Sequence, residues 1–198
     1  MSKRLLLGLW SPALAAWAGV VYLLIEIEVG AVADPIHPSR LLYYALCIAA
    51  PLLTFEPIGR IVGLRFYGAE ATVFWAGLLT LFTFVSPNNL AVSAYLLFML
   101  LLFGAASAVF LPIGYAAGFK LLTLKIHKHD VGRARREGYL AGLFIVLSAA
   151  MNLGGFYSLM NGLLLFVILV LAESFALSHK PGLEPAGADV ATSPLELG

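Results

Sequence analysis

Three carboxylates stand within or at the edge of otherwise apolar stretches of the sequence: Glu56, Glu70 and Glu173. A charged group in hydrocarbon is costly, so it usually pairs with a cation or belongs to an ion or proton pathway. Arg60 follows Glu56 by four residues, a spacing that allows pairing on a helix. Both interpretations stay open at this point, and the three glutamates form our candidate ion or proton site.

A strongly basic segment lies between residues 120 and 137. Basic side chains beside a bilayer attract anionic lipid by about 1 kcal/mol each. The same charges also mark a cytoplasmic loop, and the two roles can coexist. The candidate contacts for anionic lipid are Lys120, Lys125, Lys128, Arg133, Arg135 and Arg136.

The histidines do not form a persuasive metal or haem site. A haem carrier needs axial ligands inside its helical bundle, whereas all four histidines fall in loops or beyond a helix end. His127, His129 and Asp130 have a spacing that zinc accepts, but the neighbouring lysine and arginines repel a cation. We therefore expect no metal and no cofactor. The four are His37, His127, His129 and His179.

Catalytic motifs are also missing from the sequence. Ser107 stands among small residues, as an intramembrane nucleophile would, but no apolar stretch supplies a histidine or lysine base at its depth. A hydrogen bond to a helix carbonyl, or close helix contact, is its simpler role. The chain has no nucleotide-binding, zinc-protease or serine-hydrolase motif, and its single cysteine, Cys47, excludes an internal disulfide. We therefore expect a protein that is not an enzyme.

These residues must be positioned by an unusually apolar chain. Of its 198 residues, 61% are hydrophobic and only 12% are charged, and the mean hydropathy is +0.94. Soluble domains are about half apolar and about a quarter charged. The composition predicts an integral membrane protein, and it excludes a disordered chain, a disulfide scaffold and a nucleic-acid-binding domain. The net charge of +1 points to no strongly charged partner.

Six apolar runs are long enough, or nearly so, for the roughly 20 residues that cross a bilayer. We expect one all-α domain over residues 1–180, followed by a disordered tail at 181–198. Pro51 and Pro57 should shorten or kink the second run. The fourth run stays uncharged for thirty residues, so we expect a break near Pro112. The predicted spans are about 5–25, 41–58, 68–85, 90–111, 139–157 and 159–177.

The distribution of lysine and arginine sets the orientation, because these residues prefer cytoplasmic loops. With the N-terminus inside, eleven of the twelve basic residues are cytoplasmic and only Arg40 lies outside. Both chain ends are then cytoplasmic, and the three glutamates form a layer near the cytoplasmic ends of their helices. One alternative remains: Lys3, Arg4 and the first run could be a cleaved signal peptide, which would leave five spans.

The second half of the chain has a recognisable order of features. A long helix after Pro87 is followed by a basic loop, by Arg135-Arg136-Glu137-Gly138 opening a helix, by a short hairpin, and by a last helix carrying Glu173. This order resembles a loose family of uncharacterised small multi-pass bacterial membrane proteins. That family has Gln at the position of Glu137 and a tryptophan pair near the hairpin, where this chain has Tyr157. The resemblance implies a bacterial inner-membrane protein and transfers no active site.

Three functions are compatible with these features. The first is a non-catalytic subunit or assembly factor, whose partners are the lipid bilayer and other membrane chains or a second copy. The second is a small transporter or channel that uses the glutamate layer. The third is a lipid-active enzyme that uses acidic and basic residues at the inner face. We favour the first, because the chain has no recognisable catalytic group and is rich in the small residues that permit helix packing.

Overall fold

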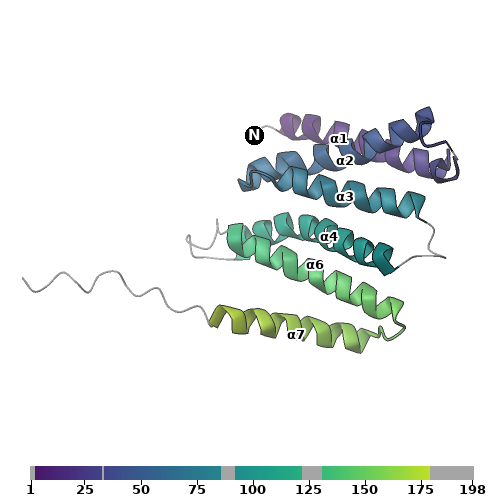
Figure 1. The fold of residues 1–198 in the computed structure, drawn as a ribbon. Coiled ribbons are helices and arrows are strands. Elements are labelled where there is room, and N and C mark those ends of the chain that lie inside the picture. The colour runs from purple at the N-terminus through teal and green to yellow at the C-terminus, as the bar shows by residue number, and fades with distance from the viewer. Residues whose placement is uncertain (1–2, 33, 86–91, 122–130, 179–198) are drawn as a thin grey trace, which may run out of the picture. The chain divides into compact units, whose positions relative to one another are not determined.

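The computed structural model describes residues 3–32, 34–85, 92–121 and 131–178 of the chain, and every regular element in those residues is helical (Figure 1). This confirms the all-α class. The chain divides into two units, Met1–Tyr157 and Ser158–Gly198, where we expected one domain over residues 1–180. The elements are α1 (Lys3–Ile25), the short 3-10 helix η1 (Val29–Ala31), α2 (Pro38–Val62), α3 (Tyr67–Phe84), α4 (Val92–Leu121), α6 (Val131–Leu153) and α7 (Leu159–Ser178).

Two of the described helices are long and apolar enough to cross a membrane. They cover Pro38–Val62 in α2 and Val92–Gly118 in α4. Two shorter apolar helices, Trp10–Ile25 and Leu159–Phe175, lie at the two ends of the described chain. The second predicted span is therefore longer than its prolines suggested, because α2 continues through both Pro51 and Pro57.

The expected break near Pro112 does not occur, and α4 runs as one helix from Val92 to Leu121. Proline has no N–H, so Pro112 cannot donate to the carbonyl of Ala108, four residues earlier. The hydroxyl of Tyr67, on α3, donates to that carbonyl instead. Because a side chain from another helix satisfies the freed group, the helix can continue through the proline.

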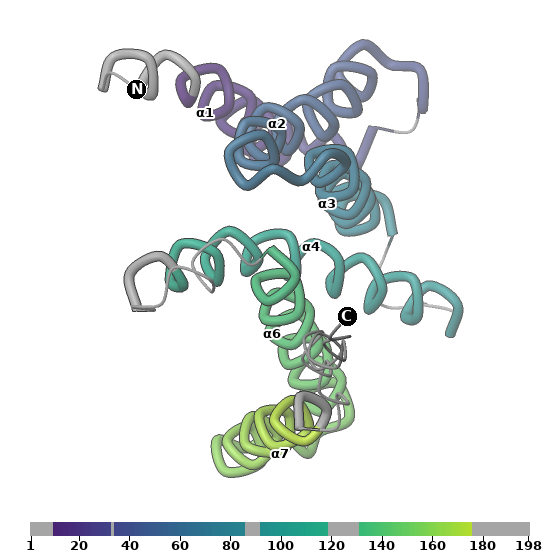
Figure 2. The backbone as a smooth tube through the Cα atoms, turned by 90° about the vertical axis from the view of Figure 1, so that its left-hand side faces the viewer, coloured from purple at the N-terminus to yellow at the C-terminus, as the bar shows by residue number. Residues whose placement is uncertain are grey.

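Within the first unit, helices that follow one another in the chain pack together: α1 with α2, α2 with α3, α3 with α4, and α4 with α6. Figure 1 shows α1, α2 and α3 side by side, and Figure 2 shows α6 against α4. One buried cluster, which includes Val20, Tyr43 and Cys47, joins α1 to α2. Another, which includes Phe55, Tyr67 and Leu111, joins α2, α3 and α4.

Arg40 holds the loop between α1 and α2 against the neighbouring helices. Its Nε donates to the carbonyl of Val29 at 3.4 Å and one terminal nitrogen donates to the carbonyl of Gly30 at 3.3 Å. Its guanidinium carbon lies 4.7 Å from the ring centre of Phe84, on α3. Arg40 therefore has a packing role at this end of the bundle, where carbonyls and an aromatic face compensate its charge.

Two glycines allow α6 to approach α4 closely. A side-chain carbon on Gly138 would lie 3.1 Å from the Cα of Leu111, and one on Gly142 would lie 2.9 Å from the carbonyl oxygen of Phe103. Both obstacles are backbone atoms, which cannot move aside as a flexible side chain can. The spacing of four residues places both glycines on one face of α6, so this face forms the seam with α4.

Gly142→Ala should therefore destabilise the bundle. We expect a loss of about 1–3 kcal/mol in the free energy of unfolding, because the added methyl group overpacks the seam. Gly132→Ala is the matched control, since Gly132 is exposed in the first turn of the same helix and alanine favours helix there. Reversible unfolding in detergent micelles measures both. Equal stability of the two variants would contradict the seam.

Candidate functional site

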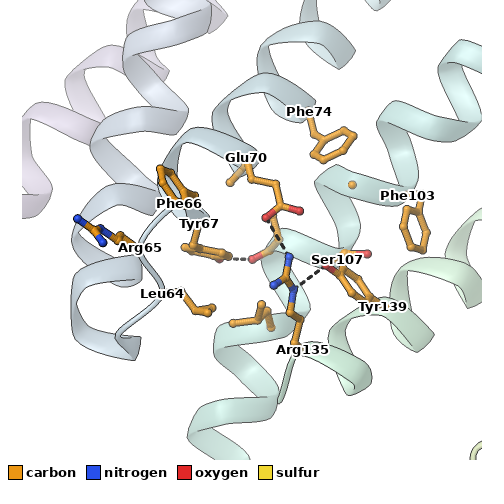
Figure 3. Close-up of a pocket in the computed structure, with 14 residues that line it drawn as sticks. Leu64, Arg65, Phe66, Tyr67, Glu70, Phe74, Phe103, Ser107, Arg135 and Tyr139 are labelled. Atoms are coloured by element: carbon orange, nitrogen blue, oxygen red, sulfur yellow. Dashed lines mark hydrogen bonds and ion pairs between the residues drawn. The ribbon is translucent and has the colours of Figure 1, made fainter. Parts of the chain in front are cut away.

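A cavity of about 290 Å³ lies between the start of α3, the middle of α4 and the start of α6 (Figure 3). All of its walls belong to the first unit. Charged and hydroxyl groups lie beside aromatic rings in this one space. The lining residues are Leu64, Arg65, Phe66, Tyr67, Glu70, Ala71, Phe74, Phe103, Gly104, Ser107, Ala108, Leu111, Arg135 and Tyr139.

The turn between α2 and α3 places the first wall of the cavity. Gly63 ends α2 with a φ of 79°, a conformation that glycine adopts without a Cβ clash. The N–H groups of Gly63 and Leu64 both donate to the carbonyl of Gly59. The chain therefore reverses at once, and Tyr67, the first residue of α3, reaches the carbonyl of Ala108 on α4.

Glu70 and Arg135 form the charged part of the cavity. One terminal nitrogen of Arg135 lies 3.5 Å from a carboxylate oxygen of Glu70, and both side chains are almost half exposed. The Nε of Arg135 donates to the hydroxyl of Tyr139 at 2.7 Å. Figure 3 shows Arg135 between these two partners, while Arg65 points away from it. The hydrogen bond with Tyr139 raises the pKa of the Arg135 guanidinium, so this group stays charged.

Ser107 brings a buried hydroxyl to the same cavity. Its residue is 5% exposed, and its Oγ has no hydrogen-bond partner among the described residues. The hydroxyl lies against Gly142 at the seam between α4 and α6. A buried hydroxyl without a partner costs about 1–3 kcal/mol, so a ligand that supplied a partner would recover that energy.

The three candidate glutamates lie in three different settings. A carboxylate oxygen of Glu56 is 3.1 Å from the Nε of Arg60 on the same helix. Glu70 is in the cavity with Arg135. Glu173 lies on α7, in the second unit. Among the described carboxylates of the first unit, Glu56 and Glu70 thus belong to separate ion pairs.

The candidate lipid contacts also separate. Arg135 lines the cavity, and Arg133 pairs with Glu137 at 3.5 Å. Arg136 has an Nε that is buried without a hydrogen-bond partner among the described residues. Lys120 belongs to α4, but its side chain lies outside the described part of the structure. Lys125, Lys128 and the possible metal ligands His127, His129 and Asp130 also lie outside the described residues.

Sequence reasoning missed Tyr67 and Tyr139 as site residues, and it assigned Ser107 no ligand. One signal was available for the seam, since Gly138 and Gly142 have the spacing that permits close helix contact. The partner helix could not be read from that spacing. The two tyrosines have no local signal, because their partners lie on other helices or one turn away in a context set by α4 packing.

Comparison with known proteins supplies no relative: no protein-family model matches the chain, and no curated protein or solved structure matches it. The function is therefore inferred from the residues of this chain, chiefly from its cavity and its exposed apolar helices.

Proposed function

We propose that the chain is a six-span protein of a bacterial inner membrane and acts as a non-catalytic subunit or assembly factor of a larger membrane complex. Both chain ends are cytoplasmic in this proposal. The basic residues support the orientation, since eleven of twelve then lie on the cytoplasmic side. The two long apolar helices, α2 and α4, support the membrane location, and so does the resemblance of the second half to small bacterial membrane proteins.

The observation that carries the proposal is α7. This helix of 20 residues belongs to a unit separate from the other helices. At 3.6 residues per turn, its exposed large apolar side chains cover more than half of its circumference. Such a helix is expected in lipid or against another protein. The exposed side chains are Leu159, Met160, Leu163, Leu164, Phe166, Val167, Ile168, Val170, Leu171 and Phe175.

The pairing of the glutamates favours this proposal over the transporter alternative. A transport site for cations or protons needs a carboxylate that can release its bound charge within the membrane. Glu56 pairs with Arg60 at 3.1 Å, and Glu70 pairs with Arg135 at 3.5 Å. An adjacent guanidinium competes with any transported cation, so these two carboxylates are better suited to holding helices together.

Labelling of single cysteines tests the topology. In a Cys47→Ala background, Ile36→Cys should react with a membrane-impermeant maleimide from outside the cell, because residue 36 lies in an outer loop. Arg60→Cys should react only after the membrane is permeabilised, because residue 60 lies at the inner end of α2. Both positions are exposed, so burial does not confound the comparison. The opposite pattern would contradict the proposed orientation.

Mass measurement of the native particle tests the role as a subunit. Extraction in mild detergent should yield a complex of fixed stoichiometry with other chains. Phe166→Ala with Phe175→Ala, on α7, should release this chain from the complex, because large side chains at an interface carry much of its binding energy. Leu96→Ala with Leu100→Ala is the control, since these residues are equally apolar and exposed on α4 and should leave the complex intact.

A particle that contains this chain alone would contradict the subunit role. The transporter alternative would then be tested by flux into vesicles, where Glu70→Gln should abolish transport without unfolding the chain. Retention of the complex in the α7 variant would contradict the assignment of α7 as the contact.

A further inference from the structure

We propose that the cavity between α3, α4 and α6 binds the zwitterionic headgroup of an aminophospholipid, with the phosphate on Arg135 and the ammonium on Glu70. This deepens the proposed function, because it rests on the membrane location given there. It does not rest on the role as a subunit, so the two can fail separately.

The charges of the cavity favour a ligand that carries both signs. Glu70 and Arg135 lie 3.5 Å apart, at the outer limit of a hydrogen bond, and both are almost half exposed. An anion alone would meet the carboxylate, and a cation alone would meet the guanidinium. A zwitterion places each of its charges beside the opposite one. A guanidinium has five N–H groups, and only two donate in the contacts with Glu70 and Tyr139, so others can reach a phosphate.

The hydroxyl groups of the cavity supply further contacts for the phosphate. Ser107 is 5% exposed, and its Oγ has no partner in the described part of the chain. Its hydroxyl can donate to a phosphate oxygen. The Tyr139 hydroxyl accepts from Arg135 and keeps its own hydrogen for donation. Figure 3 shows Ser107, Arg135 and Tyr139 close together in the cavity wall.

The start of α3 adds a favourable field for the phosphate. Phe66 precedes this helix and provides no side-chain cap for its first N–H groups. Those groups carry the partial positive charge of a helix N-terminus. Phe66 and Tyr67 both line the cavity, so the field acts where the phosphate would lie. The field supports the assignment, which stands mainly on Arg135 and Ser107.

The order of polar and apolar groups favours a lipid over a soluble phosphoamine. Phe74 lies one helical turn beyond Glu70 on α3, and Phe103 lies one turn before Ser107 on α4. In the proposed topology both rings are deeper in the membrane than the charged pair. A lipid of the inner leaflet has the same order, with its headgroup at the surface and its chains below. The volume of about 290 Å³ suits a headgroup, and Phe66, which is 76% exposed, leaves an apolar edge for the chains.

Lipid titration of the purified full chain in detergent tests the proposal. The probes are dioctanoyl phosphatidylethanolamine, phosphatidylcholine and phosphatidylglycerol, measured by native mass spectrometry. The ethanolamine lipid should bind about tenfold more tightly than the choline lipid, because only its ammonium can donate a charge-assisted hydrogen bond to Glu70. It should also bind more tightly than the glycerol lipid, whose headgroup has no ammonium. This comparison uses the wild-type chain and so does not depend on how any variant folds.

Variants assign the two ends of the headgroup. Glu70→Gln should reduce the preference for ethanolamine over choline to within about twofold, because the charged acceptor is lost. Arg135→Gln should weaken binding of both lipids by about tenfold or more, because the phosphate loses its guanidinium. Ser107→Ala should weaken binding several-fold while the unfolding midpoint stays unchanged, a combination that a purely structural serine would not give. Glu56→Gln is the control: it removes another Glu–Arg pair, outside the cavity, and should leave all affinities unchanged.

Three outcomes would overturn the proposal. The first is equal affinity of the wild-type chain for the three lipids, and the second is tighter binding of phosphatidylglycerol. The third is competition by soluble O-phosphoethanolamine as strong as that by the lipid, which would assign the cavity to a free phosphoamine. A chain that discriminates among lipids but purifies without partners would keep this proposal and contradict the subunit role.

Discussion

The hydrogen bond from the Tyr67 hydroxyl to the carbonyl of Ala108 is the contact on which the described bundle most depends. Pro112 deprives that carbonyl of its helical partner, and an unpaired carbonyl in an apolar interior costs about 1–3 kcal/mol. Tyr67 is the first residue of α3, and its ring packs edge-on against Phe55 of α2 at 6.0 Å. One side chain therefore satisfies a defect in α4 and joins three helices.

The cavity follows from this contact. With the start of α3 held against the middle of α4, Glu70 lies one turn further along and meets Arg135 of α6. The glycine seam brings α6 close enough to α4 for the two charges to share one space with Ser107. Polar groups then gather at one end and phenyl rings at the other. A site for an amphiphile thus arises from the same packing that keeps a proline-containing helix continuous.

The sequence predicts the features that depend on neighbours along the chain, and it misses those that depend on other helices. The apolar runs correctly predict helices, and the spacing of Glu56 and Arg60 anticipates their ion pair. The expected break at Pro112 is wrong, because the compensating donor lies 41 residues away. The partner of Glu70 is 65 residues away, so the cavity could not be read from either segment alone. Small residues at a spacing of four indicate a seam but not its partner.

A double-mutant cycle of Tyr67→Phe and Pro112→Ala tests the central contact most directly, with the free energy of unfolding measured in detergent micelles. With Pro112 present, Tyr67→Phe should cost about 1–3 kcal/mol, because the carbonyl of Ala108 loses its only donor among the described contacts. In the Pro112→Ala background the cost should fall to less than half, because the new backbone N–H can donate to the same carbonyl. An equal cost of Tyr67→Phe in the two backgrounds would contradict the account.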